Sequence, residues 1–122
     1  MAQVETSRYS DKDLEAFKQV ILSKIEATQK DLDYYKEQLK QTADNEDTKL
    51  RGLDDGIGTA EAERLQGLAS RQQKYIGYLK NALIRIDNKS YGICRETGKL
   101  ISKERLLVVP HATLSIEAKQ NR

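Results

Sequence analysis

The sequence predicts a mainly α fold, in which a long antiparallel coiled-coil αα-hairpin precedes a small C-terminal module built from a short β-hairpin and a helix. Three observations predict it. Charged residues make up 33% of the chain and apolar residues 38%, with no Trp and one Phe, a composition typical of solvent-exposed helices that share a narrow seam. Two apolar repeats with steps of three and four residues flank a glycine-bearing segment. A turn-rich cluster, "DNKSYG", then opens a last segment that is too short to hold a core by itself.

The first helix is expected to begin after Ser10, and residues 1–9 are expected to be a flexible N-terminus. The Ser10 hydroxyl can cap the free N–H groups of the first turn, and Asp13 completes a capping-box pattern. The apolar seam then continues for more than three heptads, which is typical of a coiled coil. Its members are Leu14, Phe17, Ile21, Ile25, Thr28, Leu32, Tyr35 and Leu39.

Residues at about 44–59 are expected to form the tip of the hairpin, which as a whole covers residues 10–88. The glycines at 52, 56 and 58 disfavour a helix interior, where each costs about 1 kcal/mol relative to Ala. Thr59 is therefore the expected cap of the second helix, with acidic residues at its positive end. The expected second seam consists of Leu65, Leu68, Gln72, Tyr75, Leu79, Ala82 and Ile86.

The remaining residues, 89–122, are expected to form the small module. The stretch "KLISKERLLVV" gives short apolar runs that fit a two-stranded element. Pro110 breaks the chain, and Thr113 can cap a short final helix that ends near Gln120.

Charge is unevenly distributed along this predicted shape. Between residues 44 and 63 there are two bases and seven acids, which are Asp44, Glu46, Asp47, Asp54, Asp55, Glu61 and Glu63. Between residues 89 and 105 there are two acids and five bases, which are Lys89, Arg95, Lys99, Lys103 and Arg105. The hairpin is therefore expected to have an acidic tip and a basic foot. The tip carboxylates fit either an ordinary polar loop or a surface presented to a cationic or metal-bearing partner.

Neither a zinc site nor an enzyme active site is expected. A structural zinc site needs four Cys or His ligands, and this chain has one of each, Cys94 and His111. Glu96 or Glu117 could add only a weak mixed site, so Cys94 is interpreted as a small buried residue. A Cys–His nucleophilic pair needs a cleft that this composition does not favour, and His111 is interpreted as a turn residue.

Other classes are also disfavoured. We see no signal peptide, no stretch near 18 apolar residues and no second cysteine, so we expect a soluble cytoplasmic protein. The net charge of +2 does not by itself indicate nucleic-acid binding. The tyrosines at 34, 35, 75 and 78 have helical spacing and are expected to flank the seam, with no basic-aromatic stripe for binding bases.

The stretch "YGICRETGKLISKERLLVVPHATLSIEAK" resembles the zinc-finger segment of the DksA/TraR family. The residues in register are Tyr91, Gly92, Cys94, Gly98, Ile101, Arg105, Leu106, Pro110 and Lys119. The likeness extends over the hairpin, to residues 10–120. It implies a bacterial regulator of transcription that binds RNA polymerase, makes no sequence-specific DNA contacts and acts as a monomer in the functional complex.

The resemblance also implies how the surfaces are used. In the family the hairpin enters the secondary channel of polymerase and places its tip near the catalytic magnesium, while the foot rests on the rim. Of the tip residues, Asp54 matches a family aspartate and has Asp55 beside it, whereas Arg51 stands in place of the other family aspartate and Gly56 in place of an alanine, which loosens the tip. The foot would use Arg95, Lys99, Lys103 and Arg105. Many members act with guanosine tetraphosphate in the stringent response. Arg71 and Lys119 match basic positions of that effector site, whereas Tyr78 stands where a Lys is expected.

The family's zinc-ligand positions are occupied by Cys94, Thr97, Ser115 and Ala118, so three thiols are missing. We therefore expect a module that folds without metal. Structural zinc supplies about 10–16 kcal/mol in isolated fingers, and burial of an apolar side chain about 1.5–3 kcal/mol. The candidates for this burial are Ile93, Leu100, Ile101, Leu106, Val108, Leu114 and Ile116. The alternative function is a structural protein whose coiled-coil seam mediates self-association.

Overall fold

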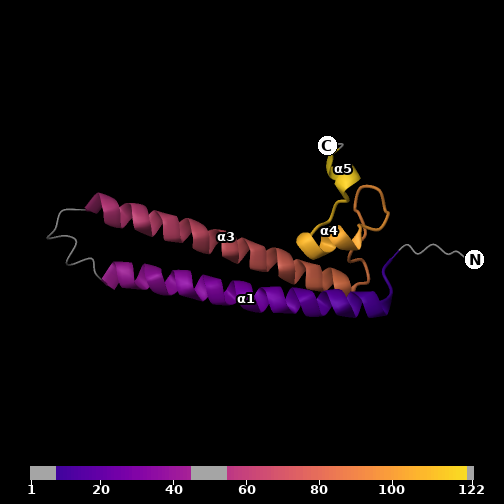
Figure 1. The fold of residues 1–122 in the computed structure, drawn as a ribbon, viewed down its shortest axis with the longest axis horizontal. Helices are drawn as coiled ribbons and strands as arrows, with labels where there is room; N and C mark the ends of the chain where they lie inside the picture. Colours follow the sequence, from indigo (N-terminus) through magenta and orange to yellow (C-terminus); the bar gives the residue numbers. More distant parts are fainter. Residues whose placement is uncertain (1–7, 45–54, 121–122) are drawn as a thin grey trace, which may run out of the picture. The chain divides into compact units, whose positions relative to one another are not determined.

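The computed structural model describes residues 8–44 and 55–120 and is mainly helical, as the sequence predicts (Figure 1). The elements are α1 (Asp11–Asp44), α3 (Asp55–Asp87), α4 (Lys103–Val108) and α5 (Ile116–Gln120). The chain divides into two compact units. The terminal unit comprises residues 1–25 and 78–122, and the middle unit comprises residues 26–77. Each unit contains a part of α1 and a part of α3.

The start of α1 is as the sequence predicts. The Asp13 N–H donates to the Ser10 side-chain oxygen at 3.1 Å, and the Leu14 N–H donates to the Ser10 carbonyl at 2.8 Å. Asp11 and Asp13 place two carboxylates in the first turn, where they favour the positive end of the helix dipole. The helix therefore begins because its free donors are satisfied by the residue that precedes it.

The second long helix begins earlier than predicted, at Asp55 instead of after Thr59. Gly56 and Gly58 lie in its first turn, where the N–H groups need no intrahelical acceptor. The penalty that the sequence argument assigned to these glycines applies to a helix interior. The prediction of a Thr59 cap was therefore wrong.

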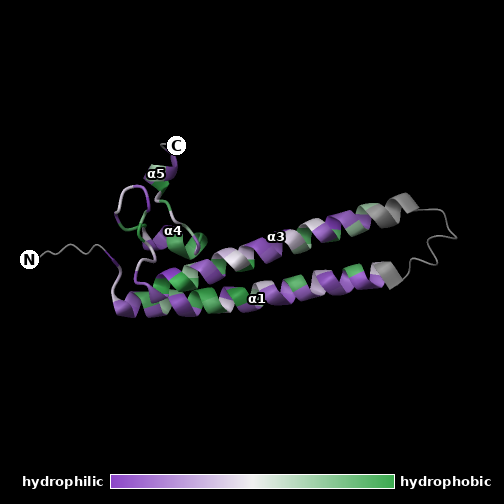
Figure 2. Ribbon diagram, turned by 180° about the vertical axis from the view of Figure 1, so that it is seen from behind, coloured by the Kyte–Doolittle hydropathy of each residue, from purple (hydrophilic) through white to green (hydrophobic). Residues whose placement is uncertain are grey.

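The seam predicted for α1 is confirmed. Leu14, Phe17, Ile21, Thr28 and Leu32 are buried, and the other predicted members are partly buried. Figure 2 shows hydrophobic residues recurring at intervals along both long helices, separated by hydrophilic ones.

On α3 the buried positions are Leu65, Ala69, Ile76, Leu79, Ala82 and Ile86. Ala69 and Ile76 thus take the places assigned to Leu68 and Tyr75, which are only partly buried. The two assignments differ by one residue, so the buried face of α3 is shifted by one position from the predicted seam in this stretch.

The C-terminal module contains less β structure than the sequence argument expected. Within the described residues its only β pairing is an isolated antiparallel bridge between Ile93 and Leu100. The second apolar run forms α4 instead, because the Ser102 side chain accepts from the Arg105 N–H at 3.2 Å and caps a helical turn.

The sequence argument predicted Thr113 as the cap of the final helix, but Ser115 caps it instead. The Ala118 N–H donates to the Ser115 hydroxyl at 3.1 Å, and α5 accordingly begins at Ile116. Of the seven candidates for burial in the module, Ile101 and Leu106 are buried. Val108 and Ile116 are exposed, with 78% and 50% of their surface accessible, so the prediction that they are buried was wrong.

Three aromatic rings form the centre of the terminal unit. The ring centroids of Tyr9 and Phe17 are 5.4 Å apart, and those of Phe17 and Tyr91 are 5.2 Å apart. The Tyr91 hydroxyl donates to the Pro110 carbonyl at 2.8 Å, and the Tyr9 hydroxyl donates to the Ile101 carbonyl. These contacts join the start of α1 to the C-terminal module, and the module thereby gains the core that it is too short to build alone.

Candidate functional site

The Cys94 thiol lies at the centre of the segment that resembles a zinc finger. Its side chain is fully buried, as the sequence argument expected, and the Ser115 N–H donates to its sulfur at 3.3 Å. The Gly98 N–H donates to the Cys94 carbonyl at 2.8 Å, and the Arg95 N–H donates to the Thr113 carbonyl at 2.9 Å. The turn around Cys94 and the segment before α5 are therefore joined through hydrogen bonds at the sulfur and the backbone.

The same hydrogen bonds favour the thiolate form of Cys94. Burial by itself raises the pKa of this thiol. Hydrogen bonds from the Thr97 side chain and from the backbone N–H groups of Ser115, Thr97 and Glu96 lower the pKa by more than burial raises it, to about 6. A sulfur that is surrounded by N–H donors in this way is stabilised as an anion without a metal ion.

The four positions that hold zinc in the family do not fit that metal in this chain. Ala118 has no donor atom, and the Ser115 hydroxyl already accepts from the Ala118 N–H. The Thr97 hydroxyl accepts from the Lys99 N–H at 3.2 Å. A single thiol with two hydroxyls is a poor donor set for Zn²⁺, which prefers Cys and His. In the described ranges, 8–44 and 55–120, no group of three or more His, Cys, Asp or Glu residues could hold a metal ion.

The basic foot predicted from the sequence separates into two kinds of residue. Lys103 pairs with Asp13 at 3.2 Å, and the Arg105 Nε donates to the Leu114 carbonyl at 2.8 Å, so both make internal contacts. Arg95 and Lys99 are exposed, and the described residues provide neither with a salt-bridge partner. Lys89 pairs with Asp11 at 2.9 Å. Arg95 and Lys99 are thus the two predicted foot residues that these internal contacts leave for a partner.

The predicted tip lies largely beyond the described residues. Asp54 is outside them, and Asp55 and Gly56 are the first two residues of α3. Their proposed roles therefore remain predictions from the sequence.

The residues predicted to contact a nucleotide effector belong to different units. Arg71 is an exposed residue of the middle unit, and Lys119 is an exposed residue of α5 in the terminal unit. Their predicted role stays a prediction.

Tyr78 stands where the resemblance leads us to expect a Lys of the effector site. Its ring is stacked on His111, with ring centroids 5.2 Å apart and an interplanar angle of 14°. The Arg85 side chain donates to the His111 carbonyl at 3.2 Å. Burial, and after it the charges of Arg85 and Arg105, lower the pKa of His111, so the stacked imidazole is held in its neutral form. The sequence argument did not foresee this stack, because residues 78 and 111 come from different elements.

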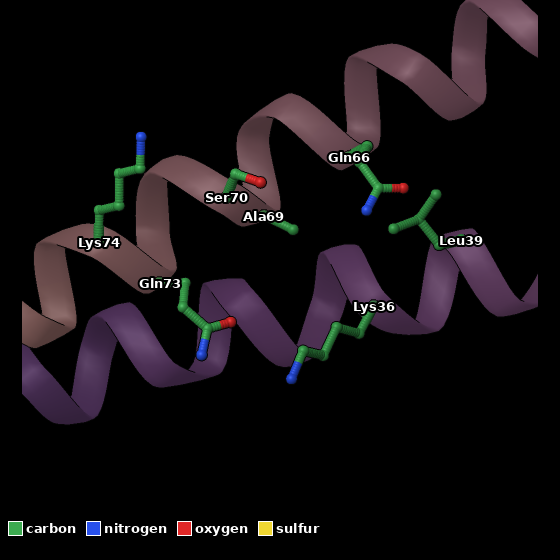
Figure 3. A pocket seen from close by; sticks show the side chains of 7 residues that line it. All are labelled: Lys36, Leu39, Gln66, Ala69, Ser70, Gln73 and Lys74. Carbon is green, nitrogen blue, oxygen red and sulfur yellow. The ribbon is translucent and has the colours of Figure 1, made fainter.

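A groove of about 300 Å³ lies between α1 and α3 in the middle unit (Figure 3). Its lining residues are Lys36, Leu39, Gln66, Ala69, Ser70, Gln73 and Lys74. The small side chains of Ala69 and Ser70 leave this space beside the seam. Figure 3 shows Lys36 and Lys74 extending in different directions, so their ammonium groups do not converge on one ligand. Arg71 is not among the lining residues.

Comparison with known proteins agrees with this arrangement. Residues 89–121 match the prokaryotic dksA/traR C4-type zinc finger. The chain is 34% identical over 114 residues to the RNA polymerase-binding transcription factor DksA of Caulobacter vibrioides, in both strain NA1000/CB15N and strain ATCC 19089, with 91% of this chain and 76% of that protein covered. The chain belongs to the DksA/TraR family. The resemblance identified from residues 91–119 is therefore confirmed.

A solved structure supports the fold over most of the chain. The transcription factor DksA2 from Pseudomonas aeruginosa matches with a TM-score of 0.79 and 27% identity, covering 88% of this chain and 81% of that one. The coiled-coil hairpin expected from the two seams is thus confirmed. None of the described helices combines the length and apolar character that crossing a membrane requires.

Proposed function

We propose that this protein is a non-enzymatic transcription regulator that binds bacterial RNA polymerase through its secondary channel. The observation that carries the proposal is the 34% identity, over 91% of the chain, to proteins named RNA polymerase-binding transcription factor DksA. The helical hairpin supports it, because two long antiparallel helices provide a narrow element that can enter a channel.

In this proposal the acidic tip acts near the active centre, and the foot contacts the rim of the channel. Asp54, with Asp55 beside it, would act electrostatically close to the catalytic magnesium. Arg95 and Lys99 would serve the rim contacts, because Lys103 and Arg105 already bind groups of the same chain. Guanosine tetraphosphate is the proposed effector, with Arg71 and Lys119 as its contacts.

The alternative of a self-associating coiled coil has less support. Its seam would have to face a second copy, but the buried seam residues of α1 and α3 pack within one chain. A monomer in the complex with polymerase is therefore the proposed state.

The test is in vitro transcription combined with polymerase binding. Asp54→Asn should leave the affinity for polymerase nearly unchanged and remove the effect on transcription, because the carboxylate is proposed to act after docking. Loss of both together would identify Asp54 as a docking residue and contradict its proposed role.

Parallel transcription reactions with and without guanosine tetraphosphate test the effector. If Arg71→Ala and Lys119→Ala leave the response to the nucleotide unchanged, these two residues are not its contacts.

A further inference from the structure

The residues that precede α1 are held against the C-terminal module by one aromatic side chain. Tyr9 is buried, and its hydroxyl donates to the carbonyl of Ile101, 92 residues further along the chain. Its ring meets the Phe17 ring edge to face, and a Cβ at Gly92 would lie 2.6 Å from two carbons of the Tyr9 ring. Withdrawal of Tyr9 would therefore uncover Gly92 and leave the Ile101 carbonyl without this donor.

Two ion pairs connect the first turn of α1 to the same module. The Lys89 Nζ lies 2.9 Å from the Asp11 carboxylate, and the Lys103 Nζ lies 3.2 Å from the Asp13 carboxylate. The Lys103 Nζ also lies 6.0 Å from the centroid of the Tyr9 ring. All four charged side chains are between 34% and 71% accessible, so dissolved salt screens both pairs.

We define residues 8–13 as the N-terminal clasp. The Arg8 side chain donates to the Tyr9 carbonyl at 3.1 Å and to the Asp11 carboxylate at 3.2 Å, so the clasp has contacts of its own. Its attachments to the module are made by Tyr9, Asp11 and Asp13, whereas the buried seam between α1 and α3 begins at Leu14. The clasp can therefore detach from the module while the two long helices stay paired.

We propose that the N-terminal clasp is a salt-sensitive conformational device that holds and releases the C-terminal module. In the closed state Tyr9 fills the space beside Gly92, and the two ion pairs keep the first turn of α1 against the module. In the open state Tyr9 is in water and the module has lost its contacts with the clasp, but the seam of α1 and α3 is intact. The device belongs to the free chain, so it does not depend on the proposed function.

Hydrogen exchange of the full-length protein, resolved by NMR, tests whether the clasp opens separately. The reporting amide is that of Ile101, which donates to the Gly92 carbonyl at 2.7 Å, and the reference amides are those of Leu79 and Ala82 in α3. If the module is released while the seam is intact, the Ile101 amide exchanges at least about tenfold faster than the reference amides and with a weaker dependence on urea. Exchange of all three amides at one rate and with one urea dependence would overturn the proposal.

Salt and charge variants test the two ion pairs. Raising sodium chloride from about 0.05 M to about 0.5 M should speed exchange of the Ile101 amide about threefold, because both exposed pairs are screened. Lys89→Gln/Lys103→Gln lacks both pairs, so its exchange should be faster at low salt and should no longer respond to salt. The matched control is Lys24→Gln/Lys80→Gln, which removes two lysines of the same unit that have no ion pair among residues 8–44 and 55–120 and should keep the wild-type response.

The opposite results are equally clear. If the wild type shows no salt response, or if Lys89→Gln/Lys103→Gln keeps the full response, the ion pairs do not hold the clasp and the proposal is wrong.

Tyr9→Phe tests the remaining attachment without removing the ring. Loss of the hydrogen bond to the Ile101 carbonyl should speed exchange of the Ile101 amide about fivefold, while the ring still occupies the space beside Gly92. Tyr9→Ala removes the ring as well and should have a larger effect. If Tyr9→Ala does not fold, Tyr9→Phe decides alone, and a wild-type exchange rate of Ile101 in that variant would contradict the role of Tyr9 in the clasp.

Discussion

The terminal unit and the middle unit are built from the same two long helices but have different cores. In the terminal unit three aromatic rings, the end of α3 and the C-terminal module enclose a core that includes Tyr91, Ile101 and Leu106. In the middle unit the core cluster consists of Leu32, Ala69 and Ile76, with Tyr35 packed against it.

This difference shows how stability is distributed along a coiled-coil hairpin. A seam contributes one apolar layer per turn, and a polar residue such as the buried Thr28 interrupts it in the middle unit. The terminal unit adds a third element, the module, and therefore buries side chains from several directions. We expect the middle unit to open locally with a smaller free energy than the terminal unit.

The largest expected effect comes from removing the central ring of the terminal unit. Tyr91 is fully buried, touches Phe17 and donates to the Pro110 carbonyl, so Tyr91→Ala should lower the free energy of unfolding by about 3–5 kcal/mol. Tyr91→Phe removes only the hydroxyl and should cost about 1 kcal/mol. Urea unfolding followed by circular dichroism measures both. Leu32→Ala is the matched change in the middle unit, and a loss as large as that of Tyr91→Ala would contradict the comparison.

A backbone substitution in the terminal unit comes next. Gly92 has φ +79°, and a Cβ there would lie 2.6 Å from two carbons of the Tyr9 ring. Gly92→Ala should therefore lower the free energy of unfolding by about 2–3 kcal/mol, from left-handed strain and displacement of Tyr9. Gly98→Ala is the control, because Gly98 has φ +76° but no atom within 4 Å of its Cβ position. If both variants lose the same stability, the Tyr9 contact contributes nothing.

Glycine substitutions in the middle unit should have the opposite sign. Gly67 and Gly77 lie inside α3, and a Cβ at either position meets no atom within 4 Å. Gly67→Ala and Gly77→Ala should each raise the free energy of unfolding by about 0.5–1 kcal/mol, because Ala orders at a lower entropic cost. Hydrogen exchange of middle-unit amides measures the effect locally. Unchanged or faster exchange would show that this unit does not limit the stability of the helix.

A smaller effect is expected from the pH dependence of the stack that holds the module to α3. The folded protein lowers the pKa of His111 through burial and through Arg85 and Arg105, so the unfolded chain binds its proton more readily. The stabilisation is thus present above the ordinary pKa of 6.5 and is lost as pH falls through the lowered value. Thermal unfolding between about pH 5 and pH 7 should therefore show a falling midpoint on acidification. His111→Gln should remove part of this slope, and an identical slope in both proteins would contradict the role of His111.

The smallest expected effect is that of metal removal. Because Cys94 is held by N–H donors and Ala118 offers no ligand, a strong chelator should leave the unfolding midpoint unchanged, and elemental analysis should find less than one zinc per chain. The control is a family member with four cysteines, which the same chelator should destabilise. Unfolding of this protein by the chelator would mean that a metal supports the terminal unit after all.

Much of the fold follows from local patterns in the sequence. The Ser10 cap and the seam of α1 are readable because a capping hydroxyl and an apolar step of three or four residues act within a few residues of chain. The family was readable from the spacing of Tyr91, Gly92, Cys94 and Pro110. The sequence could not decide whether Tyr75 or Ile76 is the buried residue of α3, because a one-residue shift of the seam leaves the helical period intact.

The candidate site was less predictable, because its groups come from distant parts of the chain. Val108 was expected in the core and is exposed, whereas Tyr9, assigned to a flexible terminus, is buried against Gly92 and donates to the Ile101 carbonyl. Lys103 reads as a free cation in the sequence, and only the structure shows that it pairs with Asp13. No local pattern reports on contacts of this kind.

By itself the sequence determined two helices, the turn-rich start of the module and the absence of three zinc-ligand thiols, since each depends on residue type and short-range spacing. The tertiary structure decided which contacts hold the C-terminal module in place: an aromatic cluster, a buried sulfur surrounded by N–H groups, and a ring stack between the module and α3. It also decided which apolar side chains stay in water. Burial and hydrogen bonding depend on which surfaces meet, and that is settled only when segments far apart in the chain come together.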